Sequence, residues 1–461
     1  MDEKLDMTKE EILQEVDESE IIKDDIEGMD DEALELTQSQ RELYTDKPDP
    51  SIESLYNKYT RGKLILQPDY QRKFVMKSQV ASRLIESILL DIPLPTVYLA
   101  EEEDGSWSVI DGQQRLTAII SFINGKFLYD NKEFKLSGLN VLTELNRKAF
   151  KELSTEQQEK IFNTAIRAIV ILKKSDDDIK FEIFERLNTG STPLNEDEIR
   201  NTIYRGKYMN LLNELEENDT FDNIVDIANF KKRMLYKGMI LRFFAFYDKS
   251  HEGYKPSMKQ LCNKHLKRFR NMDDEQIEEY RKAFKDTIDI VNMVFGKNAF
   301  RRMVKDEKSN NYKWISTRIN MALYDIQMYG FTKYKKEQIT PYMDQIRDAM
   351  YDLMTTNQDF IDAIEMRTSS TDMVTRRFRM WLDKLKEIVD TPANNPRIFP
   401  REIKEKLYAE DPTCKLCGQK ILSIDDAQVD HILPFSKGGQ TVLENAQLAH
   451  RYCNQHKSNN E

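Results

Sequence analysis

Apolar residues in the first third of the chain follow two different periods, which predicts short helices mixed with short strands. Between residues 79 and 90 the apolar side chains fall on one face of a helix. These side chains are Val80, Leu84, Ile85, Ile88 and Leu89. The runs 97–99 and 107–110 are typical of two strands joined by a turn, and the β-branched run 166–172 is typical of a buried strand. We therefore expect an α+β domain, which we place at 47–203.

The pattern changes after residue 203 and predicts a helical region over 204–390. Glycines are rare there, and long segments mix apolar and charged residues at helical spacing without clean strand signals. The proline-rich segment 391–400 predicts a linker between this region and a C-terminal segment at 401–461. The fold class expected for the whole chain is α+β.

Charge is distributed unevenly along the chain, which changes the partners that it can bind. The net charge is −11, but residues 1–46 carry 18 acidic and 4 basic side chains. The remaining residues carry 65 basic and 62 acidic side chains, so the net charge does not exclude a nucleic-acid partner. We interpret residues 1–46 as a solvated acidic arm. The alternative is a segment that imitates the charge of DNA and covers a basic groove.

Two basic stretches in the helical region are candidates for phosphate contact. One contains Lys264, Lys267, Arg268 and Arg270, and the other is the run 376–379. A solvated helix face is the simpler interpretation of each stretch, and contact with a DNA backbone is the alternative.

Nothing in the composition indicates export or a membrane partner. No apolar run approaches the roughly 20 residues that cross a bilayer, and the first residues form no apolar signal segment. Three of the four cysteines lie within the last fifty residues, which suits metal binding in a reducing compartment better than a disulfide framework. The sequence therefore predicts a cytoplasmic protein.

The C-terminal segment concentrates the residue types that bind zinc. Two residues separate Cys414 from Cys417, and two residues separate His450 from Cys453. Each pair can place two ligands on one tetrahedral ion, which gives a Cys3His site for structural Zn²⁺. A segment of about 60 residues buries little apolar surface, so such a metal would supply folding free energy. The alternative is isolated thiols that merely pack.

Between the two zinc pairs, an Asp–His pair lies in a run that is typical of a strand. The order of residues is Asp430-His431-Ile432-Leu433-Pro434, a Gly438-Gly439 turn, Asn445, and Cys453-Asn454-Gln455-His456-Lys457. This order, which follows the first two cysteines, resembles the HNH nuclease family in its zinc-stapled, McrA-like subtype. The resemblance implies a ββα-metal fold and the hydrolysis of phosphodiester bonds in DNA.

The side chains of this motif suit the steps of phosphodiester hydrolysis. His431 is the candidate general base, because imidazole titrates near neutral pH. Asp430 and Asn454 offer oxygen ligands to one catalytic divalent ion, Mg²⁺ or Mn²⁺. Asn445 is expected to hydrogen-bond the loop that carries His431. The alternative for the whole segment is a zinc ribbon that binds DNA or protein without cutting it.

Three further residues of the segment complete this interpretation. His450 stands where many members of the family have a cysteine, but imidazole also binds zinc. Lys457 is a candidate for phosphate contact. His456 is interpreted as a surface histidine, with an accessory metal ligand as the alternative.

A second motif lies in the predicted α+β domain. The run 111–115, Asp-Gly-Gln-Gln-Arg, follows the predicted strand at 107–110 and opens a helix. Glycine allows a sharp turn at the strand end, and the N-terminus of a helix attracts anions. Arg115 offers a planar fork to phosphate, while Asp111 could hold a metal or orient water. By itself, the motif fits a structural turn as well as an active site.

This motif is part of a longer series over roughly residues 50–205. It comes after the run 67–75 (Gln-Pro-Asp-Tyr-Gln-Arg-Lys-Phe-Val) and before the run 184–190 (Phe-Glu-Arg-Leu-Asn-Thr-Gly). The series resembles the N-terminal domain of GmrSD-type modification-dependent restriction enzymes and of SspE-like phage-defence proteins. The resemblance implies a fold similar to ParB and sulfiredoxin, linked to nucleotide binding and hydrolysis and to sensing modified DNA. The nuclease half of those relatives lacks the cysteine pattern of this chain.

By position, the resemblance implies a nucleotide-binding or sensing site. Its residues would be Arg72, Asp111, Gln113, Gln114, Arg115, Arg186 and Asn188. For Arg186, an ordinary position on a helix surface is the alternative.

The combined expectation is a prokaryotic anti-phage restriction endonuclease. It would cut foreign or modified DNA, under the control of an N-terminal domain that binds a nucleotide (NTP) or senses modified DNA, and it could act as a homodimer. The alternative is a nucleotide-hydrolysing regulatory switch whose C-terminal zinc unit binds DNA without cutting it.

Overall fold

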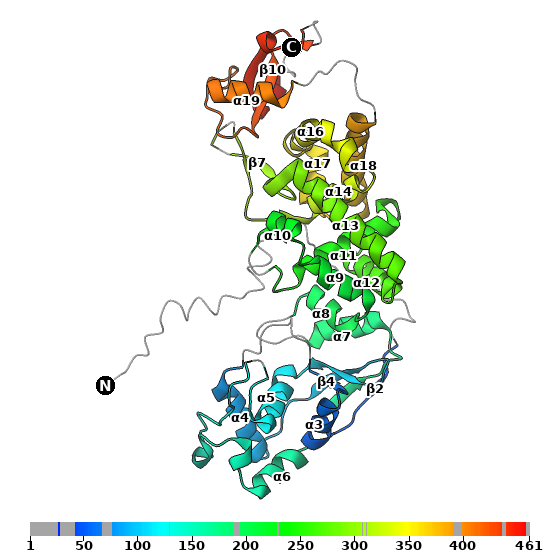
Figure 1. Ribbon diagram of the computed structural model, residues 1–461, viewed down its shortest axis with the longest axis vertical. Helices are drawn as coiled ribbons and strands as arrows, with labels where there is room; N and C mark the ends of the chain where they lie inside the picture. Colours follow the sequence, from blue (N-terminus) through cyan, green and yellow to red (C-terminus); the bar gives the residue numbers. More distant parts are fainter. Residues whose placement is uncertain are drawn as a thin grey trace, which may run out of the picture. The chain divides into compact units, whose positions relative to one another are not determined.

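The computed structural model describes residues 26–27, 42–66, 76–128, 130–187, 194–227, 230–306, 308–309, 311–390, 399–435 and 439–457. Most of the predicted arm and most of the predicted linker lie outside the described residues, as do Arg72 and Asn188. The described residues form two compact units. One comprises those between 34 and 205 with 232–235, and the other comprises 26–27, those between 206 and 231, and those from 236 onward. Figure 1 shows the helices and strands of both units.

The first unit contains a five-stranded sheet in the order β2-β6-β4-β5-β3. The strands are β2 (Thr45–Asp46), β3 (Leu64–Ile65), β4 (Val97–Glu101), β5 (Trp107–Asp111) and β6 (Ala168–Ile171). The central strand β4 pairs antiparallel with β5 and parallel with β6. The strands predicted from the alternating runs are confirmed, and the unit has a mixed α+β architecture.

Six α-helices accompany this sheet among the described residues. They are α3 (Ile52–Thr60), α4 (Ser78–Leu89), α5 (Gln113–Asn124), α6 (Thr155–Asn163), α7 (Asp177–Leu187) and α8 (Glu196–Ile203). Helix α4 packs against α5, and its Ile85 joins Leu99 of β4 and Phe122 of α5 in one buried core. The expectation that Val80 shares the buried face is wrong, because this side chain in the first turn of α4 is 51% exposed. The buried stripe begins at Ala81 instead.

The second unit is mostly helical up to residue 390, as predicted. Its helices are α9 (Lys207–Leu215), α10 (Asp219–Val225), α11 (Leu235–Lys249), α12 (Met258–Phe269), α13 (Asp274–Phe295), α14 (Met321–Phe331), α15 (Lys336–Ile339), α16 (Met343–Thr356), α17 (Gln358–Glu365) and α18 (Thr371–Val389). Two strand pairs lie in this region, although the sequence showed no strand signal there. One is the antiparallel hairpin β7 (Met303–Lys305) and β8 (Tyr312–Trp314), and the other joins β1 (Ile26–Glu27) in parallel to β9 (Ile319–Asn320). These strands have only two or three residues each, too few for a period of two to be recognised.

A buried ionic cluster joins three helices of this region. Asp325 of α14 accepts two hydrogen bonds from Arg242 of α11, at 2.6 and 2.7 Å, and a third from Arg377 of α18 at 2.9 Å. Removing one partner of such a buried set would leave an uncompensated charge, so the cluster holds the helices in one arrangement. It also corrects one interpretation of the sequence. Arg377, part of the basic run 376–379, is fully buried and is not available to phosphate.

The C-terminal part of the second unit is a small ββα domain, residues 399–457. After α19 (Arg401–Glu410), strands β10 (Ala427–His431) and β11 (Ala446–His450) form an antiparallel hairpin, and α20 (Arg451–Lys457) follows directly. Its buried core is small and consists of Cys414, Ile421, Ala427, Leu448 and Ala449. Among the described residues, no helix is long and apolar enough to cross a membrane.

Candidate functional site

The four predicted zinc ligands meet at one point of the ββα domain. The candidate ligand atoms of Cys414, Cys417, His450 and Cys453 all lie within 4.8 Å of one another. His450 Nδ1 is 3.4 Å from Cys417 Sγ and 3.8 Å from Cys453 Sγ. Zinc bonds of about 2.3 Å to sulfur and about 2.0 Å to nitrogen place two tetrahedral ligands about 3.5 Å apart. The described spacing therefore fits a tetrahedral Zn²⁺ ion.

A residue of the helical region orients the histidine of this cluster. His450 Nε2 lies 3.2 Å from Asn311 Oδ1, and the same oxygen accepts a hydrogen bond from the Leu422 amide at 3.0 Å. Because the Leu422 contact identifies this atom as the oxygen, His450 Nε2 must carry the proton. The lone pair of His450 then lies on Nδ1, the atom that faces the sulfurs. Such outer contacts are typical of metal-binding histidines.

The pKa values of the cysteine thiols are shifted in opposite directions in the cluster. Burial opposes ionisation of Cys414, but hydrogen bonds from backbone amides, including that of His450, outweigh it and hold the pKa below its ordinary value. Burial and the neighbouring sulfurs of Cys417 and Cys414 raise the pKa of Cys453 well above its ordinary value. Without a metal ion, the cluster thus favours the thiolate form of Cys414 and opposes the thiolate form of Cys453. A bound Zn²⁺ ion removes that repulsion, since zinc ligates thiolates.

One face of β10 and the helix α20 bring together the oxygen donors proposed for the divalent ion. Asp430 and Gln428 alternate with the intervening Val429, so both side chains project from the same face of the strand. Lys457 Nζ of α20 lies 2.9 Å from Asp430 Oδ2, and Asn454 Nδ2 donates to Gln428 Oε1 at 3.0 Å. Gln447 of β11 donates a further hydrogen bond to Asp430 Oδ2 at 2.7 Å.

These contacts test whether the face suits a hard divalent cation. A carboxylate and a side-chain amide oxygen are ligands that Mg²⁺ and Mn²⁺ accept. The ammonium group of Lys457, bound to Asp430, already shows that a cation is attracted to this carboxylate. The side chains of Asp430 and Asn454 therefore offer the types of ligand atom that a divalent ion accepts.

His431 occupies the end of β10, next to Asp430. Its ring is 8% exposed and lies against Phe399, with ring centroids 4.3 Å apart, and against Phe435, at 5.7 Å. Its Nε2 atom is 3.1 Å from Thr441 Oγ1. Consecutive strand residues point to opposite faces, so the His431 ring and the Asp430 carboxylate leave the backbone on different sides.

Asn445 ties the segment that follows His431 to the rest of the domain. Its side-chain oxygen accepts from the Leu433 amide at 2.8 Å, and its Nδ2 donates to the carbonyl oxygens of Leu433 and Gln440 at 3.2 and 2.9 Å. The Ile432 amide donates to the Asn445 carbonyl oxygen at 2.9 Å. These four hydrogen bonds fix the loop immediately after His431.

Gly439 lies in the same tight space, and its replacement is expected to disturb the loop. A Cβ atom at this position would lie 1.9 Å from the Leu433 carbonyl oxygen and 2.9 Å from Asn445 Nδ2. The Gly439→Ala variant should lose about 1–3 kcal/mol of stability, as crowding of packed sites does, and its DNA cleavage rate should fall. Thermal unfolding and a cleavage assay measure the two effects.

The Gly418→Ala variant provides the control for Gly439. Gly418 also lies in the ββα domain, but a Cβ atom there would meet nothing within 4 Å. Its φ of +72° makes alanine costly by roughly 1 kcal/mol without any collision. Equal losses of cleavage in both variants would show that strain, and not displacement of the loop at Asn445, causes the effect.

In the first unit, the Asp-Gly-Gln-Gln-Arg motif makes a sharp strand-to-helix turn. Asp111 ends β5, Gly112 has a φ of +91°, and α5 begins at the next residue. A Cβ atom on Gly112 would lie 2.6 Å from Val97 Cγ1, so both the backbone angle and the space require glycine. The predicted sharp turn is confirmed.

The Arg115 side chain is engaged by its own chain in this structure. Its guanidinium lies 3.1 Å from Asp111 Oδ2 and donates to the carbonyl oxygens of Pro95 and Thr96. These contacts tie the start of α5 to the segment before β4. Any phosphate at Arg115 would share the guanidinium with three existing acceptors.

Three further residues of the predicted sensing site are described by the structure, namely Gln113, Gln114 and Arg186, and they show little convergence. Gln113 is half-buried and Gln114 is exposed, both in the first turn of α5. Arg186 near the end of α7 is 75% exposed and pairs with Glu182 one helical turn away, at 2.7 Å. This contact is the one expected for an ordinary helix-surface arginine.

Several residues around the ββα domain were not singled out in the sequence. They are Asn311, Asp348, Asp352, Gln428, Thr441, Gln447 and Arg451. Gln428 shares a strand face with Asp430, and this spacing of two residues was the one local signal available. The contacts of Asn311 with His450, of Asp348 with Arg451 and of Asp352 with Gln428 cross between 76 and 139 residues of sequence, so no local pattern reveals them.

Comparison with protein-family models matches two parts of the chain. Residues 52–205 match the N-terminal domain of GmrSD restriction endonuclease, and residues 414–460 match HNH endonuclease. No curated protein matches the chain. The alternative of a regulatory switch with a non-cutting zinc unit is not favoured by these matches. With the Cys3His cluster in its HNH domain, the chain is a restriction-type DNA endonuclease that joins a GmrSD-like N-terminal domain to a C-terminal HNH domain.

Proposed function

We propose that the ββα domain hydrolyses phosphodiester bonds of foreign or modified DNA at a site formed by Asp430, His431, Asn445 and Asn454. The observation that supports this proposal most strongly is the arrangement of β10, α20 and the loop after His431. Asp430 and Asn454 lie along one strand–helix face, while Asn445 holds the loop next to the histidine. The site thus combines a candidate base with candidate ligands for a cation.

His431 acts as the general base in this proposal. The Thr441 hydroxyl can accept a hydrogen bond from His431 Nε2, and in this proposal it does so, which leaves the lone pair of the imidazole on Nδ1. Nδ1 then takes the proton of the attacking water. The Phe399 ring, tilted against the imidazole with its centroid 4.3 Å away, limits rotation of the imidazole and keeps this nitrogen in one direction.

Asp430 and Asn454 would hold one Mg²⁺ or Mn²⁺ ion. A divalent ion bound there would neutralise charge on the scissile phosphate. Lys457 would share the Asp430 carboxylate with this ion, and its ammonium group would supply a positive charge for a neighbouring phosphate. The Cys3His cluster would hold a structural Zn²⁺ ion and so keep β10, β11 and α20 together.

The first unit would sense the target or bind a nucleotide. The supporting observation is the motif 111–115, which presents the N-terminus of α5 directly after a strand, beside the Asp111–Arg115 ion pair. Arg72, Gln113, Gln114, Arg186 and Asn188 complete this proposed site. We also propose the domain limits given in the sequence analysis and a cytoplasmic location. Because one HNH site cuts one DNA strand at a time, we propose that the chain acts as a homodimer.

Cleavage of matched DNA substrates tests this proposal. The full chain is incubated with plain, methylated, glucosylated and phosphorothioated plasmids, with and without each nucleotide, in Mg²⁺ or Mn²⁺. Preferential cutting of one modified substrate, or cutting that depends on a nucleotide, supports the sensing role. Equal cutting of all four substrates regardless of nucleotide would contradict it.

Helix α12 is proposed to contact the DNA backbone. Lys264 and Lys267 are both exposed on this helix. Replacing both with glutamine should reduce the salt dependence of DNA binding, by a log–log slope of about 0.9 for each lost phosphate contact. Binding affinity measured across a salt series checks the prediction. The pair Lys282 and Lys285, exposed on α13, is the matched control, and an equal effect of both double variants would reject a specific role for α12.

A further inference from the structure

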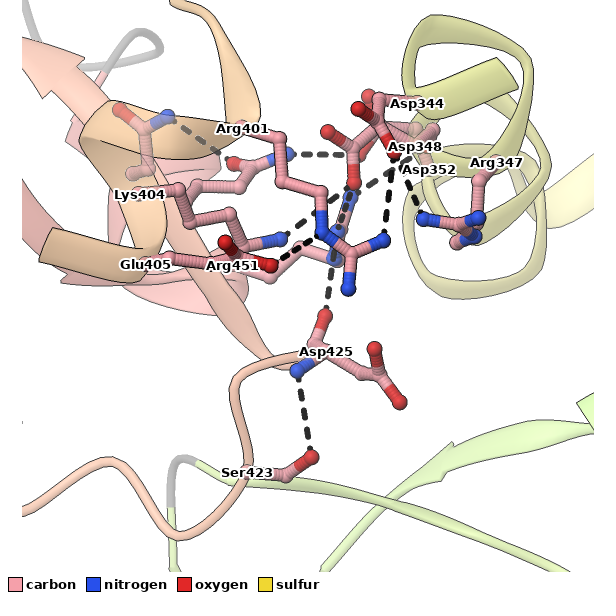
Figure 2. Close-up of polar contacts among 12 residues, drawn as sticks. Asp344, Arg347, Asp348, Asp352, Arg401, Lys404, Glu405, Ser423, Asp425 and Arg451 are labelled. Atoms are coloured by element: carbon pink, nitrogen blue, oxygen red, sulfur yellow. Dashed lines mark hydrogen bonds and ion pairs between the residues drawn. The ribbon is translucent and has the colours of Figure 1, made fainter. Parts of the chain in front are cut away.

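The HNH domain contacts an acidic face of α16 through several ion pairs. Asp344, Asp348 and Asp352 follow one another at intervals of four residues and thus share a face of the helix. Arg401 pairs with Asp344 at 3.3 Å, and Lys404 pairs with Asp348 at 3.5 Å. Figure 2 shows these acidic side chains of α16 directed at basic side chains of the HNH domain.

Arg451 is the central residue of this contact. It is the first residue of α20, its side chain is completely buried, and it pairs with both Asp348 and Asp352. Its guanidinium also donates to the Asp425 carbonyl oxygen at 3.2 Å (Figure 2). Burial opposes the charge on Arg451, but the two aspartates outweigh it and raise its pKa above the ordinary value. A buried arginine held this way fixes the position of α20 against α16.

From Asp352 a chain of hydrogen bonds continues into the nuclease site. Asp352 Oδ1 accepts from Gln428 Nε2 at 2.8 Å, and Gln428 Oε1 accepts from Asn454 Nδ2 at 3.0 Å. An ionised carboxylate can only accept hydrogen bonds, so Gln428 must present its NH₂ group to Asp352. Its oxygen then faces Asn454, which must present its own NH₂ group in turn. Asn454 Oδ1 is thereby directed away from Gln428.

The orientation of that oxygen matters because only the oxygen of an amide side chain binds a hard divalent ion. We infer that Asp352, through Gln428, is a positioning residue that keeps Asn454 Oδ1 turned toward the divalent ion. The affinity of the nuclease site for its divalent ion therefore depends on a residue of the helical region. This inference rests on the proposed role of Asn454 as a ligand of that ion.

Mn²⁺ binding to the zinc-loaded full chain tests the inference without relying on catalysis. The free Mn²⁺ concentration is followed by electron paramagnetic resonance during a titration. The Gln428→Leu variant keeps the Asp352–Arg451 pair but removes both amide contacts. It should raise the Mn²⁺ dissociation constant on the order of 10–100-fold, as the loss of outer contacts around a metal does. The Mn²⁺ concentration that half-saturates DNA cleavage should rise by the same factor.

Gln455 provides a matched control on α20. Its Nε2 also donates to Asp352 Oδ1, at 3.4 Å, but its contact does not lead to Asn454. The Gln455→Leu variant should bind Mn²⁺ within about twofold of the wild type, the scatter expected for an unrelated site. Zinc content, measured for every variant, reports whether the domain is still folded.

Asp352→Ala is the second variant, and it should weaken Mn²⁺ binding at least as much as Gln428→Leu does, because it also removes the ion pair with Arg451. The double variant should be no weaker than Asp352→Ala alone, because the chain of contacts to Asn454 is already broken in that variant. Unchanged Mn²⁺ affinity in the folded Gln428→Leu variant, with weakened binding in Asn454→Ala, would overturn the inference alone. Unchanged Mn²⁺ affinity in Asn454→Ala would instead overturn the proposed function on which the inference rests.

Discussion

The His431→Ala variant is expected to lose nearly all DNA cleavage while it keeps its zinc and its fold. Loss of a general base typically costs on the order of 10²–10⁴ in rate. His431 is not a member of the Cys3His cluster, so the structural metal should remain at full occupancy. The measurements are the cleavage rate at saturating Mg²⁺ and the zinc content of the purified variant.

His456 offers a matched control for this change. It is a histidine of the same domain, but its ring is exposed and lies against Tyr452 on the surface of α20. The His456→Ala variant should cleave DNA at close to the wild-type rate. A His431→Ala variant that cuts as fast as His456→Ala would exclude His431 as the base.

The second large effect is expected from loss of a zinc ligand. Structural Zn²⁺ contributes an apparent binding free energy of about 10–16 kcal/mol in small zinc-dependent domains. The core of the HNH domain is much too small to replace such a contribution, since five buried residues form it in the part of the domain that the structure describes. In the Cys417→Ser variant the domain should therefore lose zinc, unfold locally and become sensitive to protease between residues 399 and 457.

Cys417 is the best position for this test because it is exposed, so its replacement removes a ligand without opening a cavity. The control is Cys262→Ser, at a buried cysteine of α12 that lies outside the metal cluster. That variant should keep its zinc and a protease-resistant HNH domain. Full zinc occupancy in Cys417→Ser would contradict the proposed ligand set.

The zinc ligands could be predicted from the sequence because their chemistry is local. Each pair is held by a spacing of three positions, and hydrogen bonds from the Lys415 amide to the Leu448 carbonyl oxygen and from the His450 amide to Cys414 Sγ bring the two pairs together. The strand–turn–helix at 111–115 was predictable for the same reason, since glycine at a strand end has few structural explanations. In both places the sequence pattern involves residues that are close together in the chain, and the same residues form the local geometry.

The contacts that were not predicted join distant segments. Arg377 sits in a basic run, and only the position of Asp325 on another helix turns it into a buried structural residue. The sequence does not distinguish Asp352 from an ordinary surface aspartate, because its partner Arg451 lies 99 residues later in the chain. Val80 fits the apolar period of α4 but lies in its first turn, where the neighbouring elements leave it exposed. Periodicity identifies a helix face, but not how much of that face is covered.

The docking of the HNH domain on α16 combines residues that a local pattern predicts with contacts between distant segments that no local pattern predicts. The domain has a Cys3His cluster of its own, yet Asn311 of the helical region orients one residue of that cluster, and Asp352 contacts the strand that carries Asp430. A conformational change in the helical region could thus alter the nuclease site through existing contacts. Such coupling would give a sensing domain a physical route to control cutting.

The most direct test of the account is the metal dependence of cleavage by the zinc-loaded full chain. A supercoiled plasmid carrying the preferred modification is incubated with EDTA-treated protein that retains its tightly bound zinc, and Mg²⁺ or Mn²⁺ is then added back. The account predicts no cutting before addition and nicked or linear plasmid after it, with the Asp430→Ala and His431→Ala variants inactive under both conditions. Cutting that proceeds equally without added Mg²⁺ or Mn²⁺, or that survives in both variants, would contradict it.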